Sequence, residues 1–164
     1  MTLEIKKFKS SAHIDKRGYY WTSWKKGFLK KIKFNHDKFS LSKKNVLRGL
    51  HGDTKTWKLV SCPYGKLLLI VVNFNRNSKN FLKSSSFILS HKNRLHILIP
   101  PNFANGYLCL SKECLLHYKL SYKGSYADTN KQFSLRWNDP KLKIKWNIKK
   151  PILSYRDKKS KLLK

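Results

Sequence analysis

The sequence predicts an all-β protein, a jelly-roll barrel formed by one domain that spans residues 1–164. The apolar residues fall in short, strand-length runs rich in β-branched and aromatic side chains, and none keeps the 3.6-residue period of an amphipathic helix. Gly, Pro, Asn and Asp separate these runs at intervals typical of barrels and sandwiches. A chain of 164 residues can form one hydrophobic core.

The expected strands cover residues 19–24, 57–62, 66–74, 86–90, 96–99, 106–110, 115–120 and 133–137, and His51 is placed on a further strand. Turn-forming residues separate them at Cys62-Pro63-Tyr64-Gly65, along 73–80, and at Pro100-Pro101-Asn102. The only expected helical turn lies at 24–28. We expect the basic end, residues 158–164, to fray.

The formal net charge of +29 first suggests a protein that binds nucleic acid or a membrane surface. The lysines are spread in short pairs, without the block of five or six that marks a polyanion-binding tail. This pattern favours a solvated lysine-rich surface and no nucleic-acid partner. A non-catalytic basic barrel that binds nucleic acid or other polyanions stays an alternative. A basic field also attracts a nucleotide diphosphate.

The cysteines and the N-terminus predict a cytoplasmic protein that is not bound to a membrane. Cys62, Cys109 and Cys114 are odd in number and lack CxxC spacing, so we expect buried free thiols in a reducing compartment. The first residues contain no apolar signal-peptide segment, and no run approaches the length of a membrane span.

The motifs that are missing narrow the chemistry to acid and base catalysis by histidine. No HxH pair is present, and His91 with His96 lacks ligand spacing, so we expect no metal. The absence of GxSxG, GxGxxG and GxxxxGK[ST] argues against a serine nucleophile, a dinucleotide cofactor and phosphoryl transfer. We therefore expect no cofactor.

Four segments in order resemble the dTDP-4-dehydrorhamnose 3,5-epimerase family: SKKNVLRGLHGDTKTWKLVSCPYG, IPPNFANGYLCLS, LHYKLSYKG and RWNDPKLKIKWNIKKPILSYRD. The match runs from near Asp15 to near Asp157, which is most of the chain. The resemblance implies a cupin-like barrel, a nucleotide-diphospho-4-keto-6-deoxy sugar as substrate, and epimerisation at C3, C5 or both in surface-polysaccharide biosynthesis. It also implies a homodimer with exchanged strands, for which residues 1–17 are the candidate arm.

The resemblance assigns the proton-abstracting base to His51 of the RGLH motif, with Asp157 orienting it. Tyr118 is implied as the acid on the opposite face of the sugar, and Lys58 as the group that stabilises the enolate. These residue types suit the chemistry, because epimerisation beside a ketone needs a base, a facing acid and a cation at the developing oxyanion. Without the motifs, the usual role of a lone histidine or tyrosine on a strand is packing.

Four further residues match positions that bind substrate in the family. Arg48 is assigned to the phosphates and Arg17 to the nucleotide. Asn105 and Gln132 stand where the family commonly has His and Glu, and LHGD replaces the usual LHYQ or LHFQ. We expect these changes to line the sugar and nucleotide pocket. They suggest a branch that acts on GDP-linked 4-keto hexoses or heptoses.

Several alternatives stay open from the sequence. A 3,4-ketoisomerase on the same barrel moves a proton on one face of the sugar and needs no facing tyrosine. An inactive, degenerate epimerase is also compatible with the changed pocket. The longer region 123–130 leaves a second active-site tyrosine ambiguous between Tyr122 and Tyr126.

Overall fold

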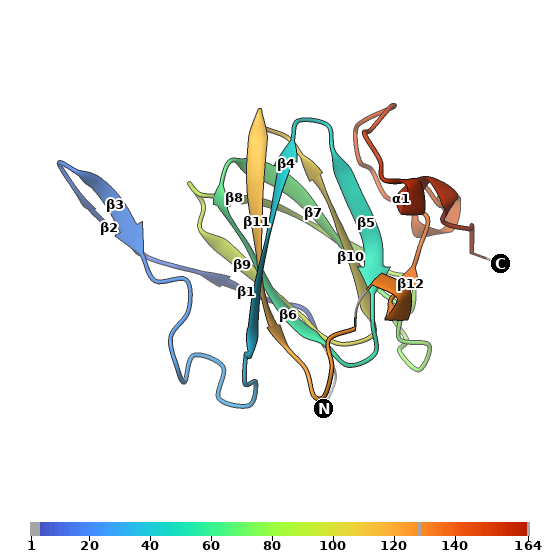
Figure 1. Ribbon diagram of the computed structural model, residues 1–164, viewed down its shortest axis with the longest axis horizontal. Coiled ribbons are helices and arrows are strands. Elements are labelled where there is room, and N and C mark those ends of the chain that lie inside the picture. The colour runs from blue at the N-terminus through green and yellow to red at the C-terminus, as the bar shows by residue number, and fades with distance from the viewer. Residues whose placement is uncertain (1–3, 128, 164) are drawn as a thin grey trace.

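The computed structural model describes residues 4–127 and 129–163, and it confirms the all-β fold class. Residues 1–3 of the predicted arm and Lys164 of the predicted tail lie outside the described residues. Two five-stranded antiparallel sheets face each other, as Figure 1 shows. The first has the order β1-β9-β6-β11-β4, the second β12-β5-β10-β7-β8, and β2 and β3 form a separate hairpin.

The strands are β1 (Lys6–Lys9), β2 (Ala12–Asp15), β3 (Gly18–Trp21), β4 (His36–Lys43), β5 (Leu47–Gly52), β6 (Trp57–Tyr64), β7 (Lys66–Asn73), β8 (Ser84–Ser90), β9 (Leu95–Ile99), β10 (Phe103–Cys109), β11 (Glu113–Ser121) and β12 (Phe133–Ser134). The helical elements are η1 (Thr129–Lys131), η2 (Pro140–Leu142) and α1 (Tyr155–Lys159). From β4 to β12 the chain crosses between the sheets at every step except the β7–β8 hairpin. This crossing order is that of a jelly roll, as predicted.

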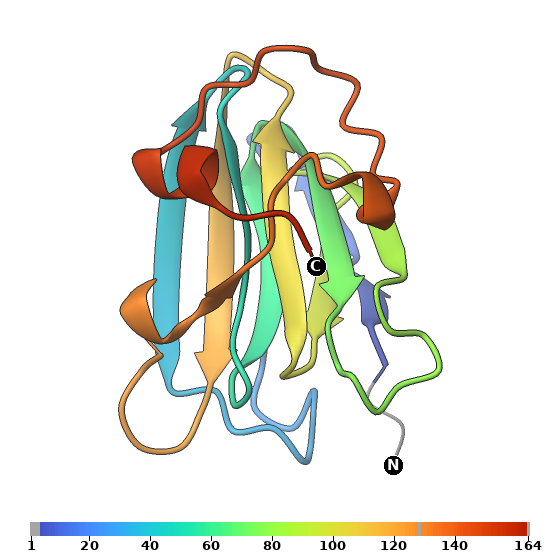
Figure 2. The ribbon, with the colours of Figure 1, turned by 90° about the vertical axis from the view of Figure 1, so that its right-hand side faces the viewer.

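Two apolar clusters hold the barrel together. The first lies between the sheets and is rich in β-branched and aliphatic residues from β6, β7, β9, β10 and β11, with Tyr107 among them. The second joins the outer face of the second sheet to the C-terminal segment through Leu50, Leu135 and Trp146. Figure 2 shows this segment running across that sheet. The C-terminal segment is thereby fixed beside β5, which carries His51.

Sequence reasoning missed β1, β2 and β4 because polar side chains interrupt their apolar residues. On β4, Ser40 and Ser42 are buried or partly buried because both hydroxyls bond the Tyr107 hydroxyl inside the barrel, at 2.9 and 2.8 Å. Strand β6 also continues through Tyr64, so the turn predicted at Cys62 to Gly65 is confined to Gly65. When the inward-facing residues of a strand are polar because they line a polar site, the strand lacks the alternation of apolar and polar residues by which it would be predicted.

The helical turn predicted at 24–28 is wrong. That segment is a loop held by single turns, and Gly27 has a φ of +87°, outside the range of a right-handed helix. In the part of the chain that the structure describes, the one α-helix is α1, which the Ser154 side chain caps by accepting from the Asp157 N–H. It is only five residues long.

The C-terminal tail differs from the expected frayed end. Lys158 and Lys159 belong to α1, and the Leu163 N–H donates to Asp139 Oδ2 at 2.6 Å. Leu163 also packs against the second apolar cluster. An apolar side chain and one buried carboxylate therefore anchor a segment whose composition is otherwise basic.

The three cysteines are free and buried, and burial raises the pKa of Cys62 to about 12. Among the described residues, no helix has the length and apolar character needed to span a membrane. The β2–β3 hairpin stands away from the barrel in Figure 1, and it exposes Ile14 and Tyr20.

Candidate active site

The site is organised around a contact between His51 and Asp157, as predicted. His51 Nε2 lies 2.8 Å from Asp157 Oδ1, and only 3% of the Asp157 side chain is exposed. His51 comes from β5 and Asp157 from the first turn of α1, 106 positions later in the chain. Packing of the C-terminal segment on the second sheet brings them together.

Several groups keep Asp157 ionised despite its burial. Burial works to raise the pKa of Asp157, but the contact with His51, the Ser154 hydroxyl and the Gly49 N–H outweigh it, so that the pKa lies below its usual value. The Ser154 hydroxyl donates to Asp157 Oδ2 at 2.9 Å. A buried carboxylate held in this way orients the imidazole and stabilises its protonated form.

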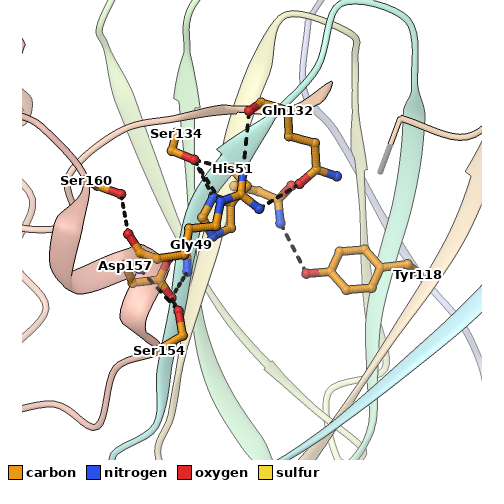
Figure 3. A network of polar contacts seen from close by, with 10 residues as sticks. Gly49, His51, Tyr118, Gln132, Ser134, Ser154, Asp157 and Ser160 are labelled. Carbon is orange, nitrogen blue, oxygen red and sulfur yellow. Dashed lines mark hydrogen bonds and ion pairs between the residues drawn. The ribbon is translucent and has the colours of Figure 1, made fainter. Parts of the chain in front are cut away.

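A cavity of about 200 Å³ lies next to His51, inside the barrel. Its walls come from both sheets and from the segment between β11 and β12: Lys38, Ser40, Arg48, His51, Lys58, Asn105, Tyr118, Leu120, Tyr126 and Gln132. Tyr118 belongs to β11 of the first sheet, whereas His51 belongs to β5 of the second. Figure 3 shows Tyr118 facing the His51 side of the cavity from across it.

Lys58 is a buried cation in the wall of this cavity. Its Nζ donates to Asn105 Oδ1 at 3.1 Å and lies 3.9 Å from Asp53 Oδ2. Burial lowers the pKa of Lys58 to about 8, and the Asp53 carboxylate opposes that shift. The ammonium is therefore mostly charged at neutral pH but titrates within reach of ordinary buffers.

Asn105 connects Lys58 to Tyr118. It accepts from Lys58 with its carbonyl oxygen and donates from Nδ2 to the Tyr118 hydroxyl at 3.4 Å. Burial is the main cause that raises the pKa of Tyr118, so the phenol stays neutral and can donate a proton. Sequence reasoning assigned Asn105 to substrate binding; its geometry also sets the distance between the other two groups.

The predicted substrate-binding residues divide into two groups. Arg48 and Gln132 line the cavity, with Arg48 Nε held by Ser42 Oγ at 2.9 Å. Arg17 is not brought to this cavity. It lies in the β2–β3 turn, where 81% of its side chain is exposed and its guanidinium pairs with Asp15 at 2.5 Å.

Two positions predicted to line the sugar and nucleotide pocket are not among the residues that line this cavity. Gly52 pairs with Phe133, and a Cβ there would meet Phe103 O at 2.4 Å and the Phe133 ring at 2.5 Å. Asp53 accepts from the N–H groups of Lys55 and Thr56, at 3.0 and 2.7 Å. Gly52 thus lets β12 approach β5, and Asp53 forms the turn that precedes β6.

Of the two tyrosines that the sequence left open, Tyr126 lines the cavity and Tyr122 does not. Sequence reasoning missed several other residues of the site. Lys38 and Ser40 line it from β4, and Ser134 contacts His51. The strand alternation that puts Ser40 and Lys38 on one face would have been a usable signal for β4. Within residues 4–127 and 129–163, no three His, Cys, Asp or Glu side chains converge as metal ligands.

Comparison with known proteins identifies relatives of this chain. Residues 3–164 match the family model of dTDP-4-dehydrorhamnose 3,5-epimerase. The chain belongs to this family of carbohydrate epimerases. The dTDP-4-dehydrorhamnose 3,5-epimerase of Salmonella typhimurium is 33% identical over 158 residues, which cover 91% of this chain and 85% of that protein.

Solved structures of family members share the fold. The Bacillus anthracis epimerase, crystallised with TDP and pyrophosphate, has a TM-score of 0.91 at 28% identity and covers 98% of this chain and 94% of its own. A Legionella pneumophila 3,5-epimerase, in complex with dTDP-4-keto-L-rhamnose, has a TM-score of 0.89 at 31% identity, covering 96% and 87%. The cupin-like barrel is therefore confirmed. The suggested GDP-linked branch gains no support, because these relatives act on or carry dTDP compounds.

Proposed function

We propose that this epimerase inverts C3 and C5 of a dTDP-linked 4-keto-6-deoxy sugar by proton transfer, with His51 as base and Tyr118 as acid. The observation that carries the proposal is that these two groups come from opposite sheets and meet one cavity. A base and an acid on opposite sides of a sugar ring are what inversion at carbon requires. Lys58 lies on β6, the strand that pairs with the Tyr118 strand β11, and it bonds Asn105 of the opposite sheet.

The proposed reaction consists of two proton transfers with an enolate between them. His51 removes a proton from a carbon next to the ketone, and the bonding electrons move onto the ketone oxygen. The Lys58 ammonium stabilises the resulting oxyanion, which a buried cation does far better than water. When the enolate collapses, Tyr118 supplies a proton to the opposite face of that carbon. Solvent then returns both side chains to their starting states.

The cations of the cavity support an anionic substrate. Lys38, Arg48 and Lys58 line it, and no Asp or Glu is among its described lining residues. Arg48 suits the diphosphate, because a guanidinium can bond two oxygens at once. The TDP bound by the Bacillus anthracis relative and the dTDP-4-keto-L-rhamnose bound by the Legionella relative favour the same nucleotide here.

The projecting β2–β3 hairpin supports a homodimer in which the N-terminal segment is exchanged. A second copy that packed on this hairpin would cover its exposed Ile14 and Tyr20. In that dimer Arg17, which does not reach the cavity of its own chain, extends toward the nucleotide bound by the partner. As in the family, the product would serve surface-polysaccharide biosynthesis.

Exchange of deuterium from heavy water into a dTDP-4-keto-6-deoxy sugar tests the proposal directly. We expect incorporation at C3 and C5 with the native enzyme, and loss of both in His51→Ala with the fold intact by circular dichroism. A protein that exchanges neither carbon would contradict the proposal.

Tyr118→Phe distinguishes epimerisation, which needs an acid on the opposite face of the sugar, from a ketoisomerase reaction on one face. It removes the hydroxyl but keeps the ring, so we expect inversion to fall by about a hundredfold while exchange on the His51 face persists. A 3,4-ketoisomerase would keep full turnover in this variant, and that result would exclude Tyr118 as the acid.

A further inference from the structure

The second ring nitrogen of His51 has a partner that the proposed mechanism does not use. Ser134 of β12 lies directly opposite His51 of β5 in the sheet register. The Ser134 hydroxyl is 3.0 Å from His51 Nδ1, so both imidazole nitrogens are engaged, one by Asp157 and one by Ser134. Figure 3 shows the two contacts on the ring.

Arg156, the residue before Asp157, holds this hydroxyl in place. Its Nε donates to Ser134 Oγ at 3.1 Å and its Nη2 donates to the same atom at 2.8 Å. The guanidinium also donates to the side chain and the backbone carbonyl of Gln132, both at 3.4 Å. One cation therefore fixes Ser134 and braces the cavity residue Gln132.

The donors and acceptors around the Ser134 hydroxyl determine which nitrogen of His51 carries the proton. A hydroxyl has one hydrogen and two lone pairs, and the two Arg156 N–H groups occupy both lone pairs. The hydrogen of Ser134 can then only point at His51 Nδ1, which must accept it and so carries no proton. The proton of the neutral imidazole is on Nε2, facing the Asp157 carboxylate.

We infer that Ser134, held by Arg156, is a positioning residue that fixes the tautomer of His51 and designates Nδ1 as the nitrogen that receives the carbon-bound proton. This inference rests on the proposed function for its catalytic consequence. Asp157 and Ser134 hold the ring at two points, so its plane is set before substrate arrives. The substrate displaces the hydroxyl from Nδ1 as it enters, since a protonated Nδ1 would have no acceptor on a hydroxyl bonded twice by Arg156.

Nitrogen NMR of ring-labelled histidine in the ligand-free protein tests the tautomer without any turnover. Well above the usual titration range of histidine, we expect an unprotonated Nδ1 and a protonated Nε2 for His51. In Asp157→Asn the side-chain amide no longer dictates the tautomer, yet Ser134 should preserve it. The double variant Asp157→Asn with Ser134→Ala should give a mixture. A protonated Nδ1 in the native protein, or a mixture already in Asp157→Asn, would overturn the inference.

Kinetics test the positioning role. We expect Ser134→Ala to lower kcat about tenfold with KM within about twofold, because a misoriented base slows proton transfer without weakening binding. Ser134→Thr keeps the hydroxyl and should recover most of kcat. Arg156→Met should resemble Ser134→Ala, whereas Arg136→Met, which loses a bond to Asn138 away from His51, should not. An unchanged kcat in Ser134→Ala would overturn the inference.

The two readouts keep this inference separate from the proposed function. If the NMR result holds but no 4-keto sugar is epimerised, the proposed function fails while the tautomer assignment stands. If the native enzyme epimerises and Ser134→Ala does so equally well, the proposed function stands and the positioning role fails.

Discussion

Residues 4–127 and 129–163 contain two histidine–aspartate pairs of nearly equal length, of which one borders the cavity with Lys58 and Tyr118. His51 is 2.8 Å from Asp157, and His117 is 2.6 Å from Asp37. The second pair connects adjacent strands of the first sheet, because His117 of β11 sits beside β4. Distance alone does not distinguish the two.

The carboxylates differ most. Asp157 is 3% exposed and takes its other contacts from Ser154 and Gly49, whereas Asp37 is 46% exposed and divides its oxygens between His117 and the Lys119 ammonium. A lysine that shares the carboxylate weakens its hold on the imidazole, and water screens what is left. Burial without a competing cation is what makes Asp157 an effective partner.

The surroundings of the two imidazoles differ as well. His51 borders a cavity that holds Lys58 and Tyr118, while the His117 ring stacks on Phe39 with 4.6 Å between ring centres. Strand alternation explains this, since neighbouring positions of β11 point to opposite faces of the sheet. Tyr118 lines the cavity and His117 lies on the aromatic-rich outer side. A histidine–aspartate pair needs an oxyanion cation and a facing acid to epimerise.

Removing one carboxylate charge at a time should show the difference between the two histidine–aspartate pairs most clearly. We expect Asp157→Asn to lower kcat by about a thousandfold, because the imidazole loses the charge that stabilises its protonated form. Asp37→Asn should stay within about twofold of the native rate. The measurement is the rate of epimerisation of a dTDP-4-keto-6-deoxy sugar. Equal losses in the two variants would show that the outer pair, His117–Asp37, also contributes to catalysis.

The pH dependence of kcat/KM should report Lys58 and not the outer pair. With a pKa of about 8, Lys58 is cationic below that value and loses its charge as the pH rises through it. We expect kcat/KM to fall tenfold per unit of pH above that point, since the neutral amine no longer stabilises the oxyanion. Tyr118, whose pKa burial raises, keeps its proton over this range.

Two variants test whether Lys58 causes the fall of kcat/KM at high pH, which is the basic limb of the pH profile. Lys58→Arg retains a cation at every accessible pH and should remove the limb, although at a lower rate, because the guanidinium is larger than the ammonium. His117→Ala should leave the profile in place. A native profile without a basic limb would contradict the titration of Lys58.

The smallest expected effect concerns stability in acid. The pKa values of Asp157 and Asp37 are both lowered in the folded protein, so each pair contributes fully above the unfolded carboxylate value near 3.8. That contribution is lost as the pH falls through the lower, folded value. At neutral pH, urea unfolding should show a loss of about 2 kcal/mol for Asp157→Asn. Asp37→Asn should lose less than about 1 kcal/mol, as exposed pairs do.

The stability differences should close as the solution is acidified. Below the folded pKa values both carboxyl groups of the native protein are neutral, as the side-chain amides of the variants are at every pH. Urea midpoints that stay parallel down to the acid limit would show that neither charge contributes to folding.

The sequence by itself predicted the fold class and the inner strands β6, β7 and β11, because each contains adjacent apolar residues and the apolar run of β7 is continuous from Leu67 to Val72. It also predicted His51, Asp157, Tyr118 and Lys58, but only through a resemblance in four segments. Strand β4 was not predicted because Lys38, Ser40 and Ser42 interrupt its apolar pattern. Residues that serve a polar cavity conceal the periodicity of the strand that carries them.

Only the tertiary structure decided how Asp157 reaches His51 and what holds the ring's other nitrogen. Asp157 and Arg156 are adjacent in a short helix, and packing of Leu135 and Trp146 on the second sheet carries that helix to β5. Composition places no special weight on Ser134, one serine among many, until β12 pairs with β5. Local pattern determines which strands form; long-range burial of apolar surface determines which polar groups they bring into contact.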